Sequence, residues 1–172
     1  MNIELYPLEK VVVDGVSIDL GMEQSDVEAA IGKGQYVKPC DRYYYYHSEM
    51  AISYNNDRKV EFIEFLGGID GSLRPAIYGV SAFDTPANEL AELLKQKNNG
   101  EIQDLERGCS LSFLNISVGV YRSATPSDVA EMIEEMKANG ISTDNNKDVE
   151  ADIRKANHWE TIGIGTAGYY RR

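Results

Sequence analysis

One glycine pattern near the end of the sequence matches a phosphate-binding motif. Residues Gly163 to Gly168 read Gly-Ile-Gly-Thr-Ala-Gly, which fits Gly-x-Gly-x-x-Gly. That motif holds a pyrophosphate when it lies between a strand and a helix N-terminus, with an acidic residue about 20 positions downstream. Only four residues follow Gly168 in this sequence, which leaves no room for that helix. We therefore interpret the pattern as a flexible turn near a C-terminal strand and expect no cofactor.

A second pattern imitates the start of a calcium-binding loop. Asp144, Asn146 and Asp148 alternate as the first ligands of such a loop do, so that their oxygens can converge on one ion. The sixth position should be glycine and the twelfth a bidentate glutamate, but these positions hold Val149 and Lys155. We therefore expect no metal ligands and interpret Asp148 as the N-cap of a helix.

The histidines His47 and His158 and the cysteines Cys40 and Cys109 also have catalytic potential. A histidine can serve as the base for a cysteine nucleophile, but no spacing in the sequence brings such a pair together. We therefore name no catalytic residue and expect a protein without enzymatic activity. Two cysteines are too few for a disulfide framework, and the question of a single bridge between them stays open.

The most unusual local feature is the tyrosine run Tyr43-Tyr44-Tyr45-Tyr46. Side chains alternate along a strand, so two of these rings should face the core and two should face outward. Tyrosine offers a large, rigid contact area with a polar tip, which makes it common in protein-binding hot spots. An exposed pair would form a docking surface, whereas an outer pair covered by the C-terminal segment would only pack.

Acidic residues near this run would give the docking surface a negative rim that favours a basic partner. The predicted partner-binding residues are therefore the four tyrosines together with Asp57, Glu61 and Glu64. Glu61 and Glu64 are not interpreted as an acid and base pair, because residues three apart on a strand point to opposite faces.

The elements that must position these residues follow a repeated order. Residues 11–20 read as strands around a turn, a helix opens at Ser25 and closes at Gly32, and strands are predicted at 43–47, 50–54 and 60–66. A strand at 77–80 then leads to a helix at 86–98 and to strands at 102–105, 109–114 and 116–121. Both halves therefore read strand, helix and three-stranded meander.

The last third of the chain differs from this repeat. A helix opens at Thr125 and closes at Gly140, a shorter helix covers about 149–157, and an extended segment follows. We expect this region to cover the sheet by protecting an edge or closing the core. The predicted fold class is α+β, with an antiparallel sheet formed by two strand-helix-three-strand modules (1–68 and 69–123). Residues 124–172 are expected to form a C-terminal helical segment and tail that packs on the modules.

The spacing around the first helix resembles a known module. Gly21-Met22, Val27 and Ile31-Gly32 follow an apolar strand and precede a meander, which is similar to β-lactamase inhibitory proteins and to small outer-membrane assembly lipoproteins of the SmpA/OmlA type. Two such modules in tandem resemble the arrangement of the inhibitors, in which a concave sheet surface grips a partner protein. The chain also resembles bacterial immunity proteins, which are small and acidic and neutralise a cognate toxin. Both resemblances imply a protein-binding function.

The net charge of the sequence indicates which kind of partner the protein would bind. The 172 residues include 17 Lys and Arg and 28 Asp and Glu, which gives a formal net charge of −11 at pH 7. Such a chain would repel nucleic acid and anionic membranes and attract a basic protein. Residues Met1 to Pro7 lack a basic region followed by an apolar run, and no apolar stretch approaches the ~18 residues that span a bilayer. We therefore expect a cytoplasmic protein.

Two functions follow from these observations. The first is a non-catalytic inhibitor or immunity protein that docks a basic partner, such as a nuclease toxin, through an acidic, tyrosine-rich sheet surface. The second is a small-ligand-binding protein or enzyme with a pocket between the sheet and the C-terminal helices, involving His158 and Trp159. A deep pocket with convergent polar groups would favour the second function, and a broad tyrosine-lined surface would favour the first.

Overall fold

The computed structural model describes residues 1–38 and 41–171. As far as residue 70 the chain forms β1 (Ile3–Tyr6), β2 (Lys10–Val13), β3 (Val16–Asp19), α1 (Gln24–Ile31), β4 (Gln35–Val37), β5 (Arg42–Tyr45), β6 (Met50–Tyr54), β7 (Val60–Phe65) and the 3-10 turn η2 (Gly68–Asp70). The rest of the chain forms β8 (Pro75–Ile77), β9 (Val80–Ser81), α2 (Ala87–Asn98), β10 (Ile102–Asp104), β11 (Ser110–Phe113), β12 (Val118–Tyr121), α3 (Pro126–Ala138), α4 (Lys147–Ala156), β13 (Thr161–Gly165) and the 3-10 turn η3 (Tyr169–Arg171).

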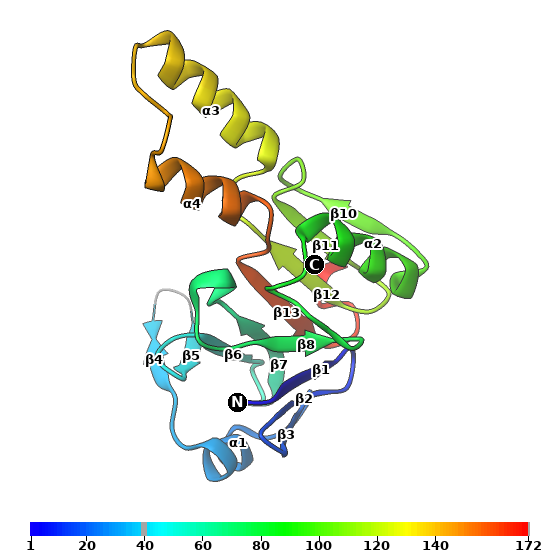
Figure 1. Ribbon diagram of the computed structural model, residues 1–172. Coiled ribbons are helices and arrows are strands. Elements are labelled where there is room, and N and C mark those ends of the chain that lie inside the picture. Colours follow the sequence, from blue (N-terminus) through cyan, green and yellow to red (C-terminus); the bar gives the residue numbers. More distant parts are fainter. Residues whose placement is uncertain (39–40, 172) are drawn as a thin grey trace.

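The strands form two sheets. The larger sheet is antiparallel with the order β10-β11-β12-β13-β7-β6-β5-β4, and the smaller sheet has the order β3-β2-β1-β8-β9. Within the described residues, only β1 and β8 pair in parallel. The smaller sheet lies against one face of the larger sheet, while α3 and α4 project away from both (Figure 1). Helices combined with mostly antiparallel sheets confirm the predicted α+β class.

A single strand, β13, holds the larger sheet together. It pairs with β12 on one side and with β7 on the other, so that Ile164 lies opposite both Val118 and Ile63. The meander of the first half and the meander of the second half are therefore joined through β13 into one sheet. The sequence leads us to expect a C-terminal region that covers the sheet, but Thr161–Gly165 lies inside it instead. The reason is that a strand in this position satisfies the facing backbone edges of β12 and β7.

The two halves follow the expected order with some added strands. β1 precedes the expected strands, and the strand expected at 77–80 is divided into β8 and β9. The first half has an extra strand, because Gln35–Val37 forms β4 beside β5, with Tyr36 opposite Tyr43. The second half places β10, β11 and β12 after α2, as the sequence predicts.

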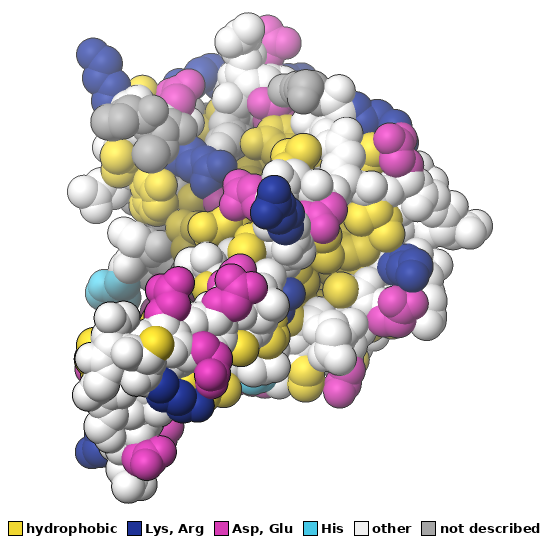
Figure 2. Space-filling view, turned by 90° about the horizontal axis from the view of Figure 1, so that it is seen from above, with side chains coloured by type: hydrophobic (Ala, Val, Ile, Leu, Met, Phe, Trp, Pro, Cys, Tyr) yellow, Lys and Arg dark blue, Asp and Glu magenta, His cyan; other side chains and the backbone are white. Residues whose placement is uncertain are grey.

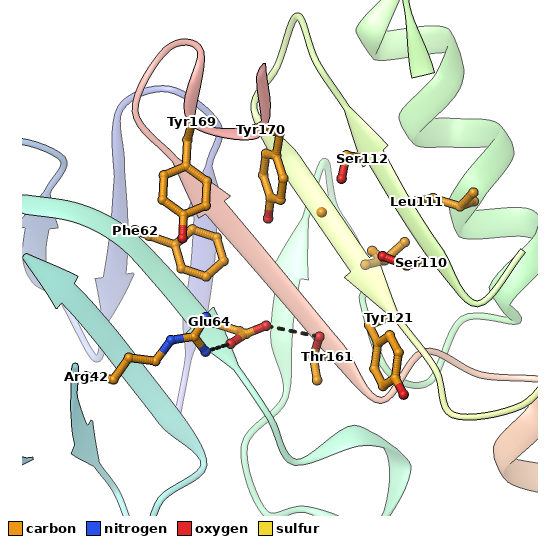
Figure 3. Close-up of a pocket in the computed structure, with 12 residues that line it drawn as sticks. Arg42, Phe62, Glu64, Ser110, Leu111, Ser112, Tyr121, Thr161, Tyr169 and Tyr170 are labelled. Atoms are coloured by element: carbon orange, nitrogen blue, oxygen red, sulfur yellow. Dashed lines mark hydrogen bonds and ion pairs between the residues drawn. The ribbon is translucent and has the colours of Figure 1, made fainter. Parts of the chain in front are cut away.

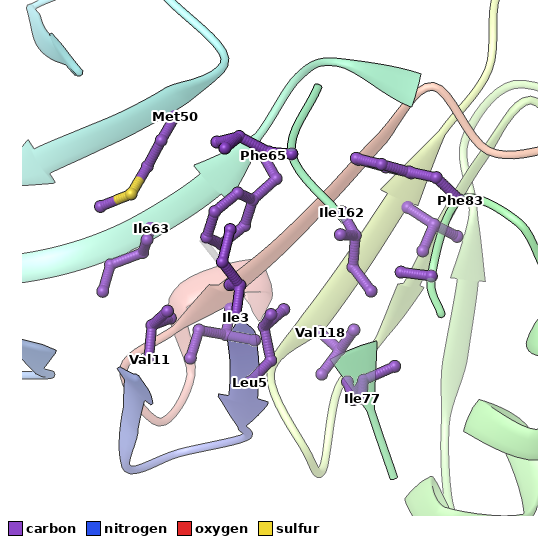
Figure 4. Packing of buried hydrophobic residues seen from close by; sticks show 14 of the residues in the cluster. Ile3, Leu5, Val11, Met50, Ile63, Phe65, Ile77, Phe83, Val118 and Ile162 are labelled. Carbon is purple, nitrogen blue, oxygen red and sulfur yellow. The ribbon is translucent and has the colours of Figure 1, made fainter. Parts of the chain in front are cut away.

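The core lies between the two sheets and receives one side of α2. The smaller sheet contributes Leu5, the larger sheet contributes Phe65 and Ile162, and α2 contributes Leu90. Figure 4 shows side chains of both sheets meeting in this cluster. Alternate residues of a strand point to opposite faces. Because Ile162 and Ile164 point into the core, Thr161, Gly163 and Gly165 lie on the other face of the larger sheet.

The helix ends follow local sequence chemistry in part. Thr125 caps α3: its side chain accepts from the Asp128 N–H, and the Asp128 side chain accepts from the Thr125 N–H. Helix α1 begins after Glu23, which makes no side-chain cap, so the predicted cap at Ser25 is wrong. Across residues 1–38 and 41–171, no helix combines the length and the apolar character needed to cross a membrane.

Helices α3 and α4 form a projecting arm, defined here as residues 126–156. Figure 2 shows it as a separate lobe at the lower left of the molecule. Its base is held by Arg122, whose guanidinium donates to the carbonyl oxygen of Ala156 at 2.8 Å. Arg154 and Lys155 of α4 pair with Asp70 at 2.5 and 3.1 Å. These contacts tie the C-terminal end of α4 to the body.

Ile162→Ala should lower the free energy of unfolding by about 3 kcal/mol, because this side chain is fully buried in the strand that joins the two meanders. Ile141→Ala is the matched control, since Ile141 lies in the loop between α3 and α4, is 51% exposed and should cost less than about 0.5 kcal/mol. Urea unfolding followed by circular dichroism measures both. Equal effects of the two substitutions would contradict the position of β13.

Candidate functional site

The face of the larger sheet that points away from the core is called the outer face here. One row of opposed residues crosses it from edge to edge, and consists of Gln35, Tyr44, Ala51, Glu64, Gly163, Gly119, Ser112 and Gln103. The middle of this row is made of small residues and one carboxylate. Strand pairing therefore brings together residues from both halves of the chain and from β13.

Two glycines of this row make room for aromatic rings. A Cβ atom at Gly119 would lie 2.2 Å from the hydroxyl oxygen of Tyr170, and a Cβ atom at Gly163 would lie 2.3 Å from Cζ of Phe62. Tyr169 completes the cluster: its ring stacks on Phe62 with centroids 4.5 Å apart and meets Tyr170 edge to face at 5.1 Å. The turn η3 therefore folds the end of the described chain back onto the outer face.

The glycine pattern at 163–168 is thus split between a strand and a turn. Gly163 and Gly165 lie within β13, and a Cβ atom at Gly165 would lie 2.6 Å from Cβ of Tyr169. Only the later part, with Gly168 at φ of +80°, forms the turn that the sequence predicts. The first glycines are needed for ring packing, because any side chain there would collide with a neighbouring ring.

The aromatic cluster forms one wall of a hollow of about 170 Å³ on the outer face (Figure 3). The other wall is a row of three residues on neighbouring strands. Tyr121 of β12 lies opposite Thr161 of β13 on one side and Ser110 of β11 on the other. The residues between the two walls include Glu64 and Ser112. The hollow therefore combines apolar ring surface with hydroxyl and carboxylate oxygens.

An ion pair lies at one end of the hollow. Nη1 of Arg42 donates to Oε2 of Glu64, and the hydroxyl of Thr161 donates to Oε1 of Glu64 at 3.3 Å (Figure 3). Burial by itself would lower the pKa of Arg42, but the Glu64 carboxylate raises it overall, so the guanidinium stays charged. The Arg42 and Glu64 side chains remain 28% and 16% exposed, which leaves polar atoms for a ligand.

The phenol of Tyr170 also lines the hollow. Burial raises its pKa well above the ordinary value of 10, and the negative charge of Glu64 adds to the effect. Its phenol therefore stays neutral over the physiological range and can act as a hydrogen-bond donor.

The structure divides the tyrosine run differently from the expected two inward and two outward rings. Strand β5 ends at Tyr45, and Tyr46 begins a turn with φ of +49°. Tyr43 and Tyr45 lie opposite core residues of β6, and Tyr45 is only 6% exposed, with its hydroxyl 3.2 Å from that of Tyr54. Within the strand, only Tyr44 belongs to the outer face. A single outward tyrosine therefore replaces the expected pair, because strand alternation stops before the fourth ring.

Of the three predicted acidic residues, the structure brings one into the hollow. Glu64 forms the ion pair described above, whereas Asp57 lies in the exposed turn between β6 and β7. Glu61 lies at an irregularity in the pairing of these strands. The predicted negative rim is therefore not assembled as one group with the tyrosines.

Several residues of the hollow were not anticipated from the sequence: Arg42, Phe62, Tyr121, Tyr169 and Tyr170. One local signal pointed to them. Glycines alternate with isoleucines at 162–165, and a Tyr-Tyr pair follows three residues later. Glycines on one face of a strand leave room for rings to lie there.

A second cavity of about 410 Å³ lies between the larger sheet and α4. His158, Lys155 and Glu160 are among its lining residues, and Nδ1 of His158 lies 2.8 Å from the carbonyl oxygen of Arg154. Trp159 borders it but is 1% exposed, and its indole N–H donates to the carbonyl of Ala87 at 2.9 Å. Trp159 therefore holds α2 and the end of α4 together.

The remaining candidate residues do not join either site. Cys109 is half-buried and forms no disulfide within the described residues. Cys40, with which a bridge was left open, lies outside those residues. His47 lies in the exposed turn that follows β5. Asn146 caps α4 by accepting from the N–H groups of Asp148 and Val149, so the predicted cap at Asp148 is two residues too late.

Comparison of the chain with protein-family models, with curated proteins and with solved structures found no match. Nor do the residues that the structure describes contain a group of three or more His, Cys, Asp or Glu that could hold a metal ion. The function is therefore inferred from the geometry and chemistry of the outer face.

Tyr170→Phe should weaken the loss of stability at alkaline pH. Because the pKa of Tyr170 is raised in the folded state, the unfolded chain releases this proton at lower pH than the folded protein does. Its contribution to the free energy of unfolding is therefore complete below pH 10 and falls above it, by up to about 1.4 kcal/mol per pH unit. The substitution should remove the contribution of Tyr170 to the decrease of the free energy of unfolding with pH.

Urea unfolding of both proteins below and above pH 10 measures this effect. The slope that remains in the variant should come from other buried phenols such as Tyr54, whose pKa burial also raises. Identical slopes in the two proteins would show that the Tyr170 hydroxyl is hydrated in the folded state.

Proposed function

We propose that the protein is a non-catalytic binding module that docks another protein on the outer face of its larger sheet. The observation that carries this proposal is the hollow, in which tyrosine rings and one arginine surround a recess with polar atoms at its base. Tyrosine and arginine are among the residues that most often dominate protein interfaces. A partner side chain that enters the hollow would meet ring surface and hydrogen-bonding groups together.

Rigid packing of the site supports the same function. Tyr169 and Tyr170 pack on each other and on Phe62, and Arg42 is held by Glu64. These side chains therefore lose little conformational freedom when a partner binds, which lowers the cost of association.

The partner that we propose is basic, which makes the protein an inhibitor-type or immunity-type molecule. A net charge of −11 would steer a basic protein toward the chain and weaken its binding as salt is added. The likeness of residues 16–32 to the module of β-lactamase inhibitory proteins supports the same class. We propose the cytoplasm as the place where this partner is met.

A second candidate function is the binding of a small polar ligand in the cavity between the larger sheet and α4. Its volume of about 410 Å³ is sufficient for a small molecule, and charged groups of both signs line it. The outer face is the better candidate because its aromatic surface provides contact area for a protein.

Tyr121→Ala should weaken capture of the partner about tenfold, because the ring forms one wall of the hollow. Tyr78→Ala is the matched control: both tyrosines are 38% exposed, but Tyr78 lies between β8 and β9 of the smaller sheet. Tagged wild type and both variants would capture proteins from a lysate of the source organism at low and moderate salt, with quantification by mass spectrometry.

We expect wild type and Tyr78→Ala to retain the same basic protein in equal amounts. Tyr121→Ala should retain less of it, and all three forms should lose it as the salt concentration rises. Retention of the same proteins in equal amounts by all three forms would contradict docking on the outer face. If no protein is retained at either salt, the small-ligand function becomes the better account.

A further inference from the structure

The arm, residues 126–156, contributes no residue to the hollow on the outer face. Its helices pack on each other, and among the contacts with the body are the ion pairs of Arg154 and Lys155 with Asp70 and the hydrogen bond from Arg122 to Ala156. Figure 1 shows α3 extending beyond the sheets. An isolated pair of helices can bury only the sides that face each other.

The apolar side chains of the arm are accordingly left half open. Val129 and Val149 are both 5% exposed, but Met132, Ile133 and Met136 of α3 are only half-buried. Ile153 follows Val149 by one helical turn and is 44% exposed. These apolar side chains form a stripe along each helix, and the stripe extends beyond the surface that the two helices bury against each other.

A groove of about 240 Å³ opens between α3 and α4 at the base of the arm. Val129, Met132 and Ala156 supply apolar surface, and Asp128, Asp152 and Lys155 also line it. The Lys155 ammonium is paired with Asp70 of the body, so the two carboxylates leave the groove with a negative excess. Methionine side chains adapt readily to the shape of an incoming group. The groove therefore suits one apolar side chain that lies beside a positive charge.

The charge of the arm distinguishes between possible occupants. Residues 126–156 contain eight Asp or Glu and four Lys or Arg, and acidic side chains gather along the lobe in Figure 2. Two of the four cations, Arg154 and Lys155, already pair with Asp70 of the body. A second arm would be repelled by this excess of negative charge, whereas a basic segment would be attracted.

We infer that the arm is a second docking surface, independent of the outer face, whose occupant is a basic amphipathic helix of a partner protein. An apolar side chain of that helix enters the groove and covers Met132, while lysine or arginine side chains lie beside Asp128 and Asp152. Helix-in-groove recognition of this kind uses apolar anchors spaced by one helical turn.

The test uses a fluorescently labelled synthetic peptide in which leucine and lysine repeat at helical spacing, titrated with the full chain and followed by anisotropy. Met132→Ser removes groove surface and should weaken binding about tenfold. Ile153→Ser is the second variant, because this side chain is already 44% exposed and its loss should leave folding intact. Its binding should also fall severalfold.

Leu105→Ser is the matched control, since Leu105 is 72% exposed in the turn after β10, outside the arm. It should bind the peptide as wild type does, and so should Tyr121→Ala, which separates this proposal from docking on the outer face. A peptide of leucine and glutamate should bind at least tenfold more weakly. Equal binding by all variants, or equal binding of both peptides, would overturn the proposal, as would an arm-dependent dimer in light scattering.

Discussion

The pairing of β13 with β12 on one side and β7 on the other is the interaction on which the rest of the structure depends. It joins two meanders, each of which would otherwise present an unpaired backbone edge, into one sheet. The same strand directs Ile162 and Ile164 into the core and places Thr161 and Gly163 on the outer face. Core and site are therefore two sides of one strand, and the residues of the hollow meet only when the sheet is complete.

The two surfaces that we propose for binding differ in their chemistry. On the outer face, the charges of Arg42 and Glu64 balance each other, so we propose that this surface binds mainly through shape, ring area and hydrogen bonds. The arm carries an excess of carboxylates and an apolar stripe that its own helices leave half open. A basic partner would be attracted by the whole charge of the molecule and held by the packed tyrosines, since steering acts mainly on association and buried contacts on dissociation.

Local patterns predicted where the helices and most strands lie, because helix periodicity and strand alternation depend on neighbouring residues. The exact helix starts were less predictable, since the caps expected at Ser25 and Asp148 were wrong. Thr125 caps α3 as its sequence suggests, and the strand expected at 109–114 is β11, in which Leu111 and Phe113 alternate with serines and pack in the core. Long-range pairing was not predictable: nothing near Gly163 shows that its strand inserts between β12 and β7, so its glycine pattern was interpreted as a turn. The prediction of two outward tyrosines in the run 43–46 was wrong for a local reason. Tyr46 lies in a turn with positive φ, which strand propensity does not reveal.

Native-state hydrogen exchange tests most directly the claim that β13 makes the two meanders one sheet. With increasing urea below the unfolding transition, the backbone amides of β7, β12 and β13 should exchange with one common free energy, equal to that of global unfolding. Two separate free energies for β7 and β12, or amides of β13 that exchange faster than those of both neighbours, would contradict it. The outer face would then not be a single surface.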